Sequence, residues 1–243
     1  MQLEIGVNLF NRQKEEGVLV RDGLVAEYRF DEGRGQVLCD YSGNGNHGQL
    51  GSTRKADTND PLWTPQGLEF DGVDDYVDCG NKECLSIANN ITMLGWIKRG
   101  VEESRHNTIF SKGNTESYIV DIRDNLLRFF AFNAGITVGI VSPPWDATTL
   151  YKDVWYHIAT SHDGNIWRCY VNGNLDVELQ DSRDVGVTSN PMWIGSRYAS
   201  LSRSYQGEMA LMHIYNRTFT PEEVLQNYEW SKTELAKRGV NLE

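Results

Sequence analysis

Short runs rich in apolar residues, many alternating with polar ones, follow one another from about residue 24 to residue 216. Glycine, asparagine and aspartate separate these runs. The runs at 118–122 and 126–132 flank a polar triplet at 123–125 and predict a β-hairpin. Many strands at short spacing, joined by glycine-rich turns, are typical of sandwiches and barrels. The pattern therefore predicts an all-β domain.

The clearest predicted meander begins with the run at 155–161, which Asp163-Gly164 follows. The next run, at 166–171, ends at Asn172-Gly173. Asp-Gly and Asn-Gly pairs supply the positive φ angles that tight hairpin turns need. Because side chains alternate across a strand, one face of the middle run carries Trp167, Cys169 and Val171.

A helix is predicted near the C-terminus, starting around residue 220. Thr220 is a good N-cap, Pro221 suits the first helical position, and Glu223 completes a capping box. The segment continues with a helical pattern to about residue 237, and Gly239 then favours a stop. An apolar stripe on this helix is formed by Val224, Leu225 and Tyr228.

The chain carries a formal net charge of −11, which repels phosphates and argues against a nucleic-acid partner. No run of eighteen apolar residues is present, so the sequence predicts no membrane insertion. Residues 1–6 lack the basic and apolar regions of a secretory signal. Export by another route, or inside a particle, stays open.

The four cysteines form no CxxC pair, so a zinc ribbon is not indicated. Cys79 and Cys84 flank a Gly-Asn turn, and the sequence is equally consistent with a disulfide there and with free thiols. Neither tail holds the roughly 50 residues of a second domain.

Several motifs occur in the order found in one known family. They are GLVAEYRFDEG at 23–33, DYSGNGNHG at 40–48, LEFDGVDDYV at 68–77, WYHIA with DG and YVNG within 155–173, Ile194-Gly195, and IYNR at 214–217. Over about residues 23–229 the chain resembles laminin G-like and concanavalin A-like lectin domains. The resemblance implies a jelly-roll sandwich of two antiparallel sheets with the helix packed at one end. We predict an N-terminal arm at 1–22, a laminin G-like domain at 23–230 and a helical tail at 231–243.

The resemblance also implies one calcium ion near the opening strand, the Asn/Gly loop and the penultimate strand. The corresponding oxygens are those of Asp31 or Glu32, of Asp40, and of carbonyls from Asn44 to Asn46. Calcium prefers six to eight such oxygens. One departure weakens this expectation: Ala210 stands where many relatives carry Asp, although a backbone carbonyl there is still a competent ligand. The Ala-Leu variant resembles that of virion-associated proteins.

Glycoside hydrolysis is a weaker expectation. Sandwich relatives that cut β-glucans carry Glu-x-Asp-x-Glu on one strand face, and a retaining enzyme needs two carboxyls about 5–5.5 Å apart. Here Glu69 and Asp71 are followed by Val73, so the second glutamate is missing. The sequence therefore predicts a protein that is not an enzyme.

Sugar binding is favoured by aromatic residues in predicted loops, because sugars stack on aromatic faces. The candidates are Trp63, Trp145, Tyr198 and Tyr205. For the two tryptophans, core packing is an equally good interpretation.

The function predicted is a non-catalytic recognition or adhesion module that binds a glycan or a protein surface, with calcium as a possible brace. The alternative is a phage or prophage virion component that assembles into an oligomer or particle through its arm and C-terminal helix. A polysaccharide hydrolase or lyase is the weakest of the three. The expected location is extracellular or virion-associated.

Overall fold

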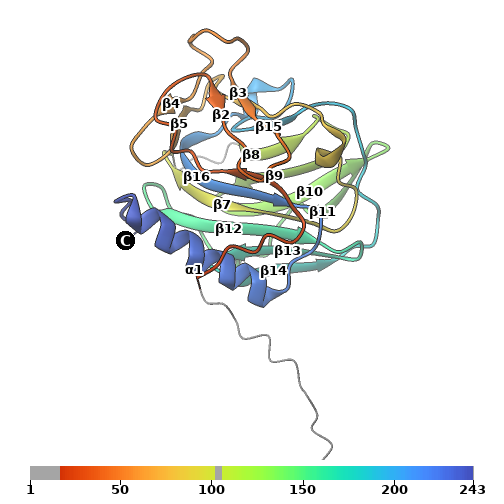
Figure 1. Cartoon of the computed structure of the whole chain (residues 1–243). Coiled ribbons are helices and arrows are strands. Elements are labelled where there is room, and N and C mark those ends of the chain that lie inside the picture. The colour runs from red at the N-terminus through yellow and green to blue at the C-terminus, as the bar shows by residue number, and fades with distance from the viewer. Residues whose placement is uncertain (1–16, 102–105, 243) are drawn as a thin grey trace, which may run out of the picture.

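The computed structural model describes residues 17–101 and 106–242 of the chain. Two antiparallel β-sheets face each other, and one helix near the C-terminus packs against the outer face of one sheet (Figure 1). The predicted all-β sandwich with a C-terminal helix is confirmed. Within the described residues, no helix is long and apolar enough to cross a membrane.

The sheet next to the helix, called sheet A, has the strand order β14-β13-β12-β7-β16-β5-β4, with β1 also pairing with β16. Its strands are β1 (Leu24–Tyr28), β4 (Leu62–Trp63), β5 (Leu68–Asp71), β7 (Ile91–Arg99), β12 (Trp155–His162), β13 (Ile166–Val171), β14 (Asn174–Gln180) and β16 (Gln206–Tyr215).

The second sheet, called sheet B, has the order β11-β10-β9-β8-β15-β6-β3-β2. Its strands are β2 (Val37–Leu38), β3 (Gly48–Leu50), β6 (Val77–Asp78), β8 (Asn107–Lys112), β9 (Tyr118–Arg123), β10 (Leu126–Asn133), β11 (Ile136–Ile140) and β15 (Met192–Ile194). Two short 3-10 turns lie in the connections, η1 (Glu83–Leu85) and η2 (Leu201–Arg203).

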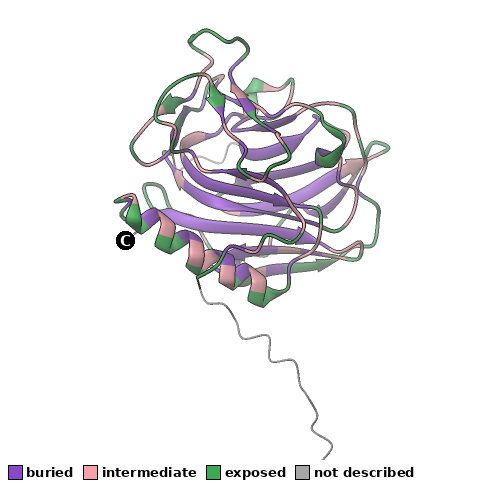
Figure 2. Ribbon diagram, in the orientation of Figure 1, coloured by how far each residue is buried: buried purple, intermediate pink, exposed green. Residues whose placement is uncertain are grey.

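The main hydrophobic core fills the space between the two sheets, and the central strands are buried along most of their length (Figure 2). Trp167, Cys169 and Val171 all point into this core, as the alternation in β13 predicts. Tyr170 points the other way, into a second cluster beneath the helix. Burial of each large apolar side chain contributes about 1.5–3 kcal/mol, so these rows hold the sandwich together.

The predicted hairpin turns adopt left-handed backbone. The β9–β10 turn has φ of 52° at Asp124 and 64° at Asn125. The β13–β14 turn has φ of 49° at Asn172 and 79° at Gly173, and Gly164 has φ of 88° in the β12–β13 turn. Asn, Asp and Gly tolerate this region best, so turn chemistry fixes the strand pairing in this part of the chain.

Helix α1 (Pro221–Lys237) starts with the predicted capping box, in which Thr220 and Glu223 bond reciprocally. The helix continues past residue 230 to Lys237, and so includes the first part of the predicted helical tail at 231–243. Leu235 lies in a cluster with Trp96 of sheet A, and the Trp96 Nε1 donates to Ser231 Oγ over 2.8 Å.

The described end of the predicted arm lies beside α1, where the red segment begins in Figure 1. The Val20 amide donates to Asn227 Oδ1 over 3.0 Å, and the Tyr215 hydroxyl donates to the Val20 carbonyl over 2.8 Å. Leu19 is buried there. The rest of the predicted arm, residues 1–16, lies outside the described residues.

Two histidines are buried between sheet A and the helix. The rings of His157 and Tyr228 are 5.4 Å apart, and those of His213 and Trp230 are 5.6 Å apart. Neither imidazole has a hydrogen-bond partner within the described part of the chain. Burial disfavours the charged form and lowers the pKa of each to about 3.

Candidate functional site

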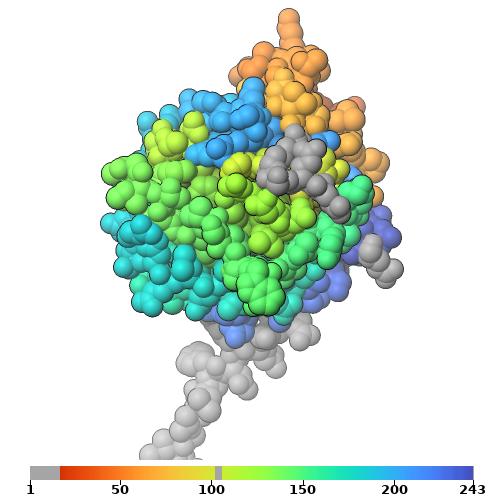
Figure 3. All heavy atoms as spheres, turned by 180° about the vertical axis from the view of Figure 1, so that it is seen from behind, coloured from red at the N-terminus to blue at the C-terminus, as the bar shows by residue number. Residues whose placement is uncertain are grey.

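A hollow of about 670 Å³ opens where the two sheets meet at their β11 and β14 edges. We call it the β11–β14 hollow. Backbone and side chains from β11, from the loop after it and from β14 form its wall. The lining residues are Gly139, Ile140, Val141, Ser142, Pro144, Asp146, Asp176, Val177, Glu178 and Leu179. The green segment that includes this loop lies across the middle and lower part of the face shown in Figure 3.

Trp145 stands between two residues that line this hollow, Pro144 and Asp146. Its side chain is 93% exposed, whereas the other six of the chain's seven tryptophans are buried or half-buried. Leaving an indole in water forgoes the free energy that its burial would contribute. Core packing, the alternative interpretation of this residue, is therefore not what the structure shows.

The loop that carries Trp145 is fixed by local bonds. The Asp176 carboxylate on β14 accepts the Thr148 amide over 2.9 Å, which ties the loop to sheet A. The Ala147 amide donates to the Pro144 carbonyl over 3.1 Å and closes a turn around the indole. These bonds fix the backbone that carries Trp145, so the loop itself loses little conformational entropy when it binds a ligand.

The charge of the hollow is negative. Asp146 and Glu178 are exposed, and Asp176 is half-buried. Glu178 is paired with Arg168 over 2.8 Å. No lysine or arginine is among the lining residues, so the hollow offers carboxylate acceptors, and Trp145 is the chain neighbour of the lining residues Pro144 and Asp146 without lining the hollow itself.

The other predicted aromatic residues lie elsewhere. Trp63 is half-buried against the core, and its Nε1 donates to the Gly35 carbonyl over 2.8 Å. The half-buried ring of Tyr198 packs edge-on against Trp193, with 5.1 Å between centroids. These two residues are held by the protein, and neither is among the residues that line the β11–β14 hollow.

Tyr205 was expected in a surface loop, in contact with a sugar, and the structure places it in the core instead. It is 0% exposed and its ring meets Phe70 edge-on at 6.1 Å, inside the core between the sheets. Burial raises the pKa of its hydroxyl well above the ordinary value. The serine- and arginine-rich stretch before Tyr205 indicated a surface loop, but the Tyr205 amide bonds the Gly195 carbonyl over 2.7 Å and turns the ring inward.

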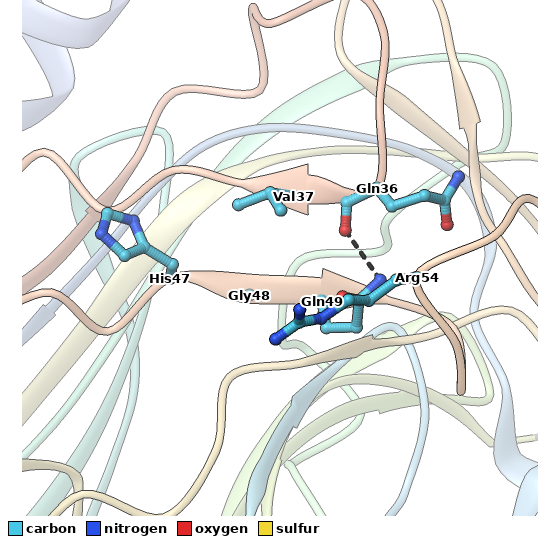
Figure 4. A pocket seen from close by; sticks show the side chains of 6 residues that line it. All are labelled: Gln36, Val37, His47, Gly48, Gln49 and Arg54. Carbon is cyan, nitrogen blue, oxygen red and sulfur yellow. Dashed lines mark hydrogen bonds between the residues drawn. The ribbon is translucent and has the colours of Figure 1, made fainter.

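A second hollow, of about 460 Å³, lies at the β2–β3 edge of sheet B and is shown in Figure 4. Gln49 Nε2 donates to the Gln36 carbonyl over 2.9 Å, and His47 points away from this contact. His47 Nδ1 accepts the Asp40 amide over 3.0 Å. Arg54 supplies a cation, and no tryptophan, tyrosine or phenylalanine lines this hollow.

The predicted calcium loop is organised by Asp40. One of its carboxylate oxygens accepts the amides of Glu27 over 3.0 Å and Ser42 over 2.9 Å. The other accepts the Ser42 hydroxyl over 2.9 Å and the Asn46 amide over 2.8 Å. A carboxylate has about four acceptor directions, so protein donors use the capacity of Asp40 fully.

Asn44 and Asn46 are committed in the same way, since their side-chain amides donate to the Val25 carbonyl over 3.0 Å and 2.9 Å. The backbone oxygens of Asn44 and Gly45 accept the Lys82 ammonium, over 3.0 Å and 2.6 Å. The Lys82 ammonium therefore occupies two backbone carbonyls of the segment from which calcium ligands are predicted.

The remaining predicted ligands do not supply a cage. Glu32 Oε1 accepts the Cys39 amide over 2.8 Å. Asp31 is exposed and lies 3.4 Å from a guanidinium nitrogen of Arg238. Ala210 is wholly buried in the cluster beneath α1. Glu32 Oε2 is buried without a hydrogen-bond partner among the described residues, but one such oxygen falls far short of the six to eight that calcium prefers, so the donor set at this loop does not fit a calcium ion.

A different group of carboxylates could hold a metal ion. One oxygen from each of Asp71, Asp74 and Asp75 lies within 4.8 Å of the others. Asp75 is buried and accepts the Asp71 amide over 2.7 Å, and Asp74 accepts the Asn59 side-chain amide over 2.6 Å. Burial, together with the charges of Asp71 and Asp74, raises the pKa of Asp75 to about 7.

All four cysteines are free thiols, so Cys79 and Cys84 are not bridged. The sequence names Trp145 as a candidate but does not name Asp176 and Glu178, because their place on β14 beside the Trp145 loop depends on how the two sheets meet. For Asp146, the sequence offers one local indication of a role in binding, its position directly after Trp145 in a proline-rich loop.

Solved structures share this fold. Domain 4 of AbnA, an extracellular arabinanase from Geobacillus stearothermophilus seen with arabinotriose, matches with a TM-score of 0.64 and 17% identity, over 84% of this chain and 98% of that one. The binding domain of Paraclostridial Mosquitocidal Protein 1 matches with a TM-score of 0.65 and 13% identity, over 86% of this chain.

The ligand-binding domain of botulinum neurotoxin serotype D, in complex with N-acetylneuraminic acid, matches with a TM-score of 0.61 and 15% identity, over 86% of this chain. The present chain spans about half the length of the two toxin structures, 52% and 51% respectively. Identities this low show a common fold and nothing more.

Among curated proteins, none matches the chain. The profile of the concanavalin A-like lectin/glucanases superfamily matches residues 71–225, which is more than half of the sequence. The sandwich described above is the fold that the resemblance implied. The chain belongs to the concanavalin A-like lectin/glucanase superfamily.

Proposed function

We propose that the protein is a non-catalytic carbohydrate-binding module whose ligand lies in the β11–β14 hollow, stacked on Trp145. The observation that carries this function is the 93% exposure of a tryptophan on a fixed loop, beside a hollow lined by carboxylates. Pyranose and furanose rings present an apolar face of C–H groups, which an indole plane covers well. Their hydroxyls donate hydrogen bonds that carboxylates accept.

Two relatives of similar fold support the ligand class. The arabinanase domain was seen with arabinotriose, and the toxin domain with N-acetylneuraminic acid. A module of this kind would work where glycans are displayed, and the arabinanase domain comes from an extracellular enzyme. We therefore propose an extracellular or virion-associated location.

Catalysis is not part of this function. Glu69 and Asp71 on β5 lack the second glutamate of the glucanase pattern, because Val73 stands in its place. Asp75 has the raised pKa of a general acid, but it is 4% exposed and bonded to a backbone amide. A substrate would have to displace that contact before it could take a proton from Asp75.

Calcium is expected to have no part in sugar contact. The carboxylate cluster of Asp71, Asp74 and Asp75 belongs to β5 and the loop after it, and none of its members lines the β11–β14 hollow. A bound cation there would brace that loop and change stability.

A glycan array tests the function, run with wild-type protein, Trp145→Ala and Tyr41→Ala, in calcium and in EDTA. Tyr41→Ala is the matched control, since Tyr41 is also an exposed aromatic residue but stacks on Arg29 away from the hollow. Expected is a hit that Trp145→Ala removes, that Tyr41→Ala keeps and that EDTA leaves unchanged. No hit on a broad array would contradict carbohydrate binding and favour assembly through the arm and α1.

A further inference from the structure

Two histidines lie on the outer face of sheet A and pack against side chains of helix α1. His157 comes from β12 and His213 from β16, and both residues are 0% exposed. The ring of His157 lies 5.4 Å from that of Tyr228, and the ring of His213 lies 5.6 Å from that of Trp230. Because Tyr228 and Trp230 belong to α1, the contact with the helix is part of what keeps both imidazoles from water.

Both imidazoles are buried without polar compensation. None of their four ring nitrogens has a hydrogen-bond partner within the described residues. A neutral imidazole has one donor and one acceptor, so each ring forgoes two hydrogen bonds that water would supply. A protonated ring in the same place would cost far more, because a buried charge is tolerated only when it is paired.

The carboxylate that stands opposite His213 is already committed to arginines. Glu27 faces His213 across the pairing of β1 with β16. One oxygen of the Glu27 carboxylate binds Arg29 over 2.9 Å, and the other binds Arg21 over 3.2 Å. A protonated His213 would therefore have to compete with two guanidinium groups for this partner.

The other charges around the two rings do not favour protonation either. Burial is the first cause that lowers the pKa of His213, and the charge of His157 is the second. Arg21, Arg29 and Arg238 lower it further, and burial lowers the pKa of His157. On the packing elements, Lys98 pairs with Glu208, Glu234 with Lys237 and Glu223 with Arg217, Lys232 lies over the Tyr228 ring, and Glu222 and Glu229 are exposed.

A third buried histidine shows the contrast. His162 is also 0% exposed, but it stacks on Trp167 in the core between the sheets, with 4.1 Å between ring centroids. Burial lowers the pKa of His162, while the charges of nearby aspartates, Asp163 first among them, raise it. Its protonation would act on the sandwich, whereas that of the two histidines beneath α1 would act on the contact with the helix.

The attachment of α1 is local. The core between the two sheets contains no residue of this helix. The helix is held by apolar contacts on the outer face of sheet A, such as that of Leu235, and by single bonds, such as the one of 2.8 Å from Trp96 to Ser231. Local openings of this kind cost less free energy than unfolding of the whole domain. The helix can therefore leave without breaking the core between the sheets.

We propose that α1 is an acid-released element: when His157 and His213 take up protons, the helix leaves the outer face of sheet A and the two-sheet sandwich stays folded. Water then solvates the two charges, which the closed interface cannot do. Release exposes the apolar face that α1 covers, which includes Leu94, Trp96 and Tyr170. This device is separate from the proposed sugar site.

Amide hydrogen exchange of the full chain at pH 6.5 and pH 4.5, corrected for the intrinsic effect of pH, tests the release. A histidine with a pKa of about 3 when covered and about 6.5 in water favours opening by about fifty-fold more at the lower pH. With two such histidines, the amides of α1 should lose protection by on the order of a thousand-fold. The amides of β9 and β10 in sheet B should stay more strongly protected than those of α1 at both pH values.

The double variant His157→Phe, His213→Leu fills the same space with side chains that do not titrate, and should reduce the acid effect on α1 to less than about ten-fold. His162→Phe, buried in the core between the sheets, is the matched control and should keep the wild-type response.

Three results would overturn the proposal. In the first, α1 and sheet B exchange together at both pH values, which would mean that helix and sandwich open as one unit. In the second, the protection of α1 does not change with pH. In the third, the double variant keeps the acid response of the wild type. If the double variant does not fold, the comparison of α1 with sheet B in the wild type still decides.

Discussion

The Asp40 loop and the Trp145 loop are both polar surface segments that the sequence marks as candidates for binding. In the Asp40 loop every predicted ligand side chain turns back to the protein, and the Asp40 carboxylate accepts four hydrogen bonds within it. In the Trp145 loop, bonds to the backbone fix the loop while the indole itself stays 93% exposed.

The difference shows that residue type alone does not separate structure from function. A carboxylate whose acceptor directions are all filled stabilises the fold, because each bond satisfies a donor that would otherwise be buried unpaired. An aromatic side chain without a place in the core is available to a ligand. Variants in the two loops should therefore separate stability from binding.

The largest effect is expected for Asp40→Ala. Removing the carboxylate leaves the amides of Glu27, Ser42 and Asn46 without their acceptor, at a cost of about 3–5 kcal/mol in the free energy of unfolding. Urea unfolding measures this loss, with Asp31→Ala as an exposed control that should change stability by less than about 0.5 kcal/mol. Sugar affinity per folded molecule should not change. An Asp40→Ala protein of full stability would contradict the structural role.

Acid should weaken the fold through the two histidines buried beneath α1. The pKa of His157 and of His213 is about 3 in the folded protein and about 6.5 when unfolded, so unfolding takes up protons as the pH falls below about 6.5. Their contribution is complete above that pH and is lost progressively toward pH 3, by about 1.4 kcal/mol per pH unit for each. Asp75, with a pKa of about 7 in the folded protein, binds its proton more tightly there than in the unfolded chain. Its contribution to stability therefore grows as the pH falls, and between pH 4 and 6.5 it cancels the loss caused by about one histidine.

These three groups together lower stability by about 1.4 kcal/mol per pH unit from 6.5 to 4.5, and His162, whose pKa is also lowered by burial, adds to the fall in the same sense. Urea unfolding at the two pH values measures the slope. His213→Leu should make the slope shallower by about 1.4 kcal/mol per pH unit, since the buried leucine keeps the packing against α1 and does not titrate. A slope that is unchanged by this substitution would place the titrating group elsewhere.

Trp145→Ala should lower sugar affinity about ten- to hundred-fold, roughly 1.4–2.8 kcal/mol, because a tryptophan at the centre of a contact carries much of its energy. The free energy of unfolding should stay within about 0.5 kcal/mol of wild type, since the indole lies in water. Titration calorimetry and urea unfolding of one preparation give both numbers. Loss of stability with unchanged affinity would reverse the contrast between the two loops.

The smallest effect is expected for Lys82→Met, which removes the ammonium from the carbonyls of Asn44 and Gly45. An exposed charged contact of this kind contributes about 0.5–1 kcal/mol. Thermal unfolding, with Lys82→Arg as the charge-conserving control, detects a loss of this size. The melting temperature of the wild type should not change when calcium is added. A rise caused by calcium that binds at this loop would contradict the role of Lys82 as the cation that occupies it.

Local chemistry made part of the molecule predictable. The hairpin turns at Asp163-Gly164 and Asn172-Gly173, and the helix start at Thr220, follow from positive φ angles and capping within a few residues. The order of motifs identified the sandwich. Interpretation failed where partners are distant in the chain: Lys82 meets Asn44 across 38 residues, and Tyr205 is buried by its contact with Phe70.

The candidate site was half predictable for the same reason. The proline-rich loop around Trp145 is visible in the sequence, but its carboxylate partners Asp176 and Glu178 come from β14, which reaches the loop only after both sheets have formed. No local pattern could show whether the carboxylate of a given aspartate accepts hydrogen bonds from the protein in every direction, as Asp40 does, or stays exposed at the β11–β14 hollow, as Asp146 does.

The central claim is that Trp145 contacts the sugar, and an NMR titration of the seven indole N–H signals tests it most directly. Each tryptophan is assigned by substitution, and an oligosaccharide identified on the array is added stepwise. The account predicts that the Trp145 signal shifts most, while those of Trp63 and Trp167, whose indoles are bonded or buried within the protein, stay in place. Saturable binding that moves the Trp63 signal and leaves the Trp145 signal unchanged would contradict it.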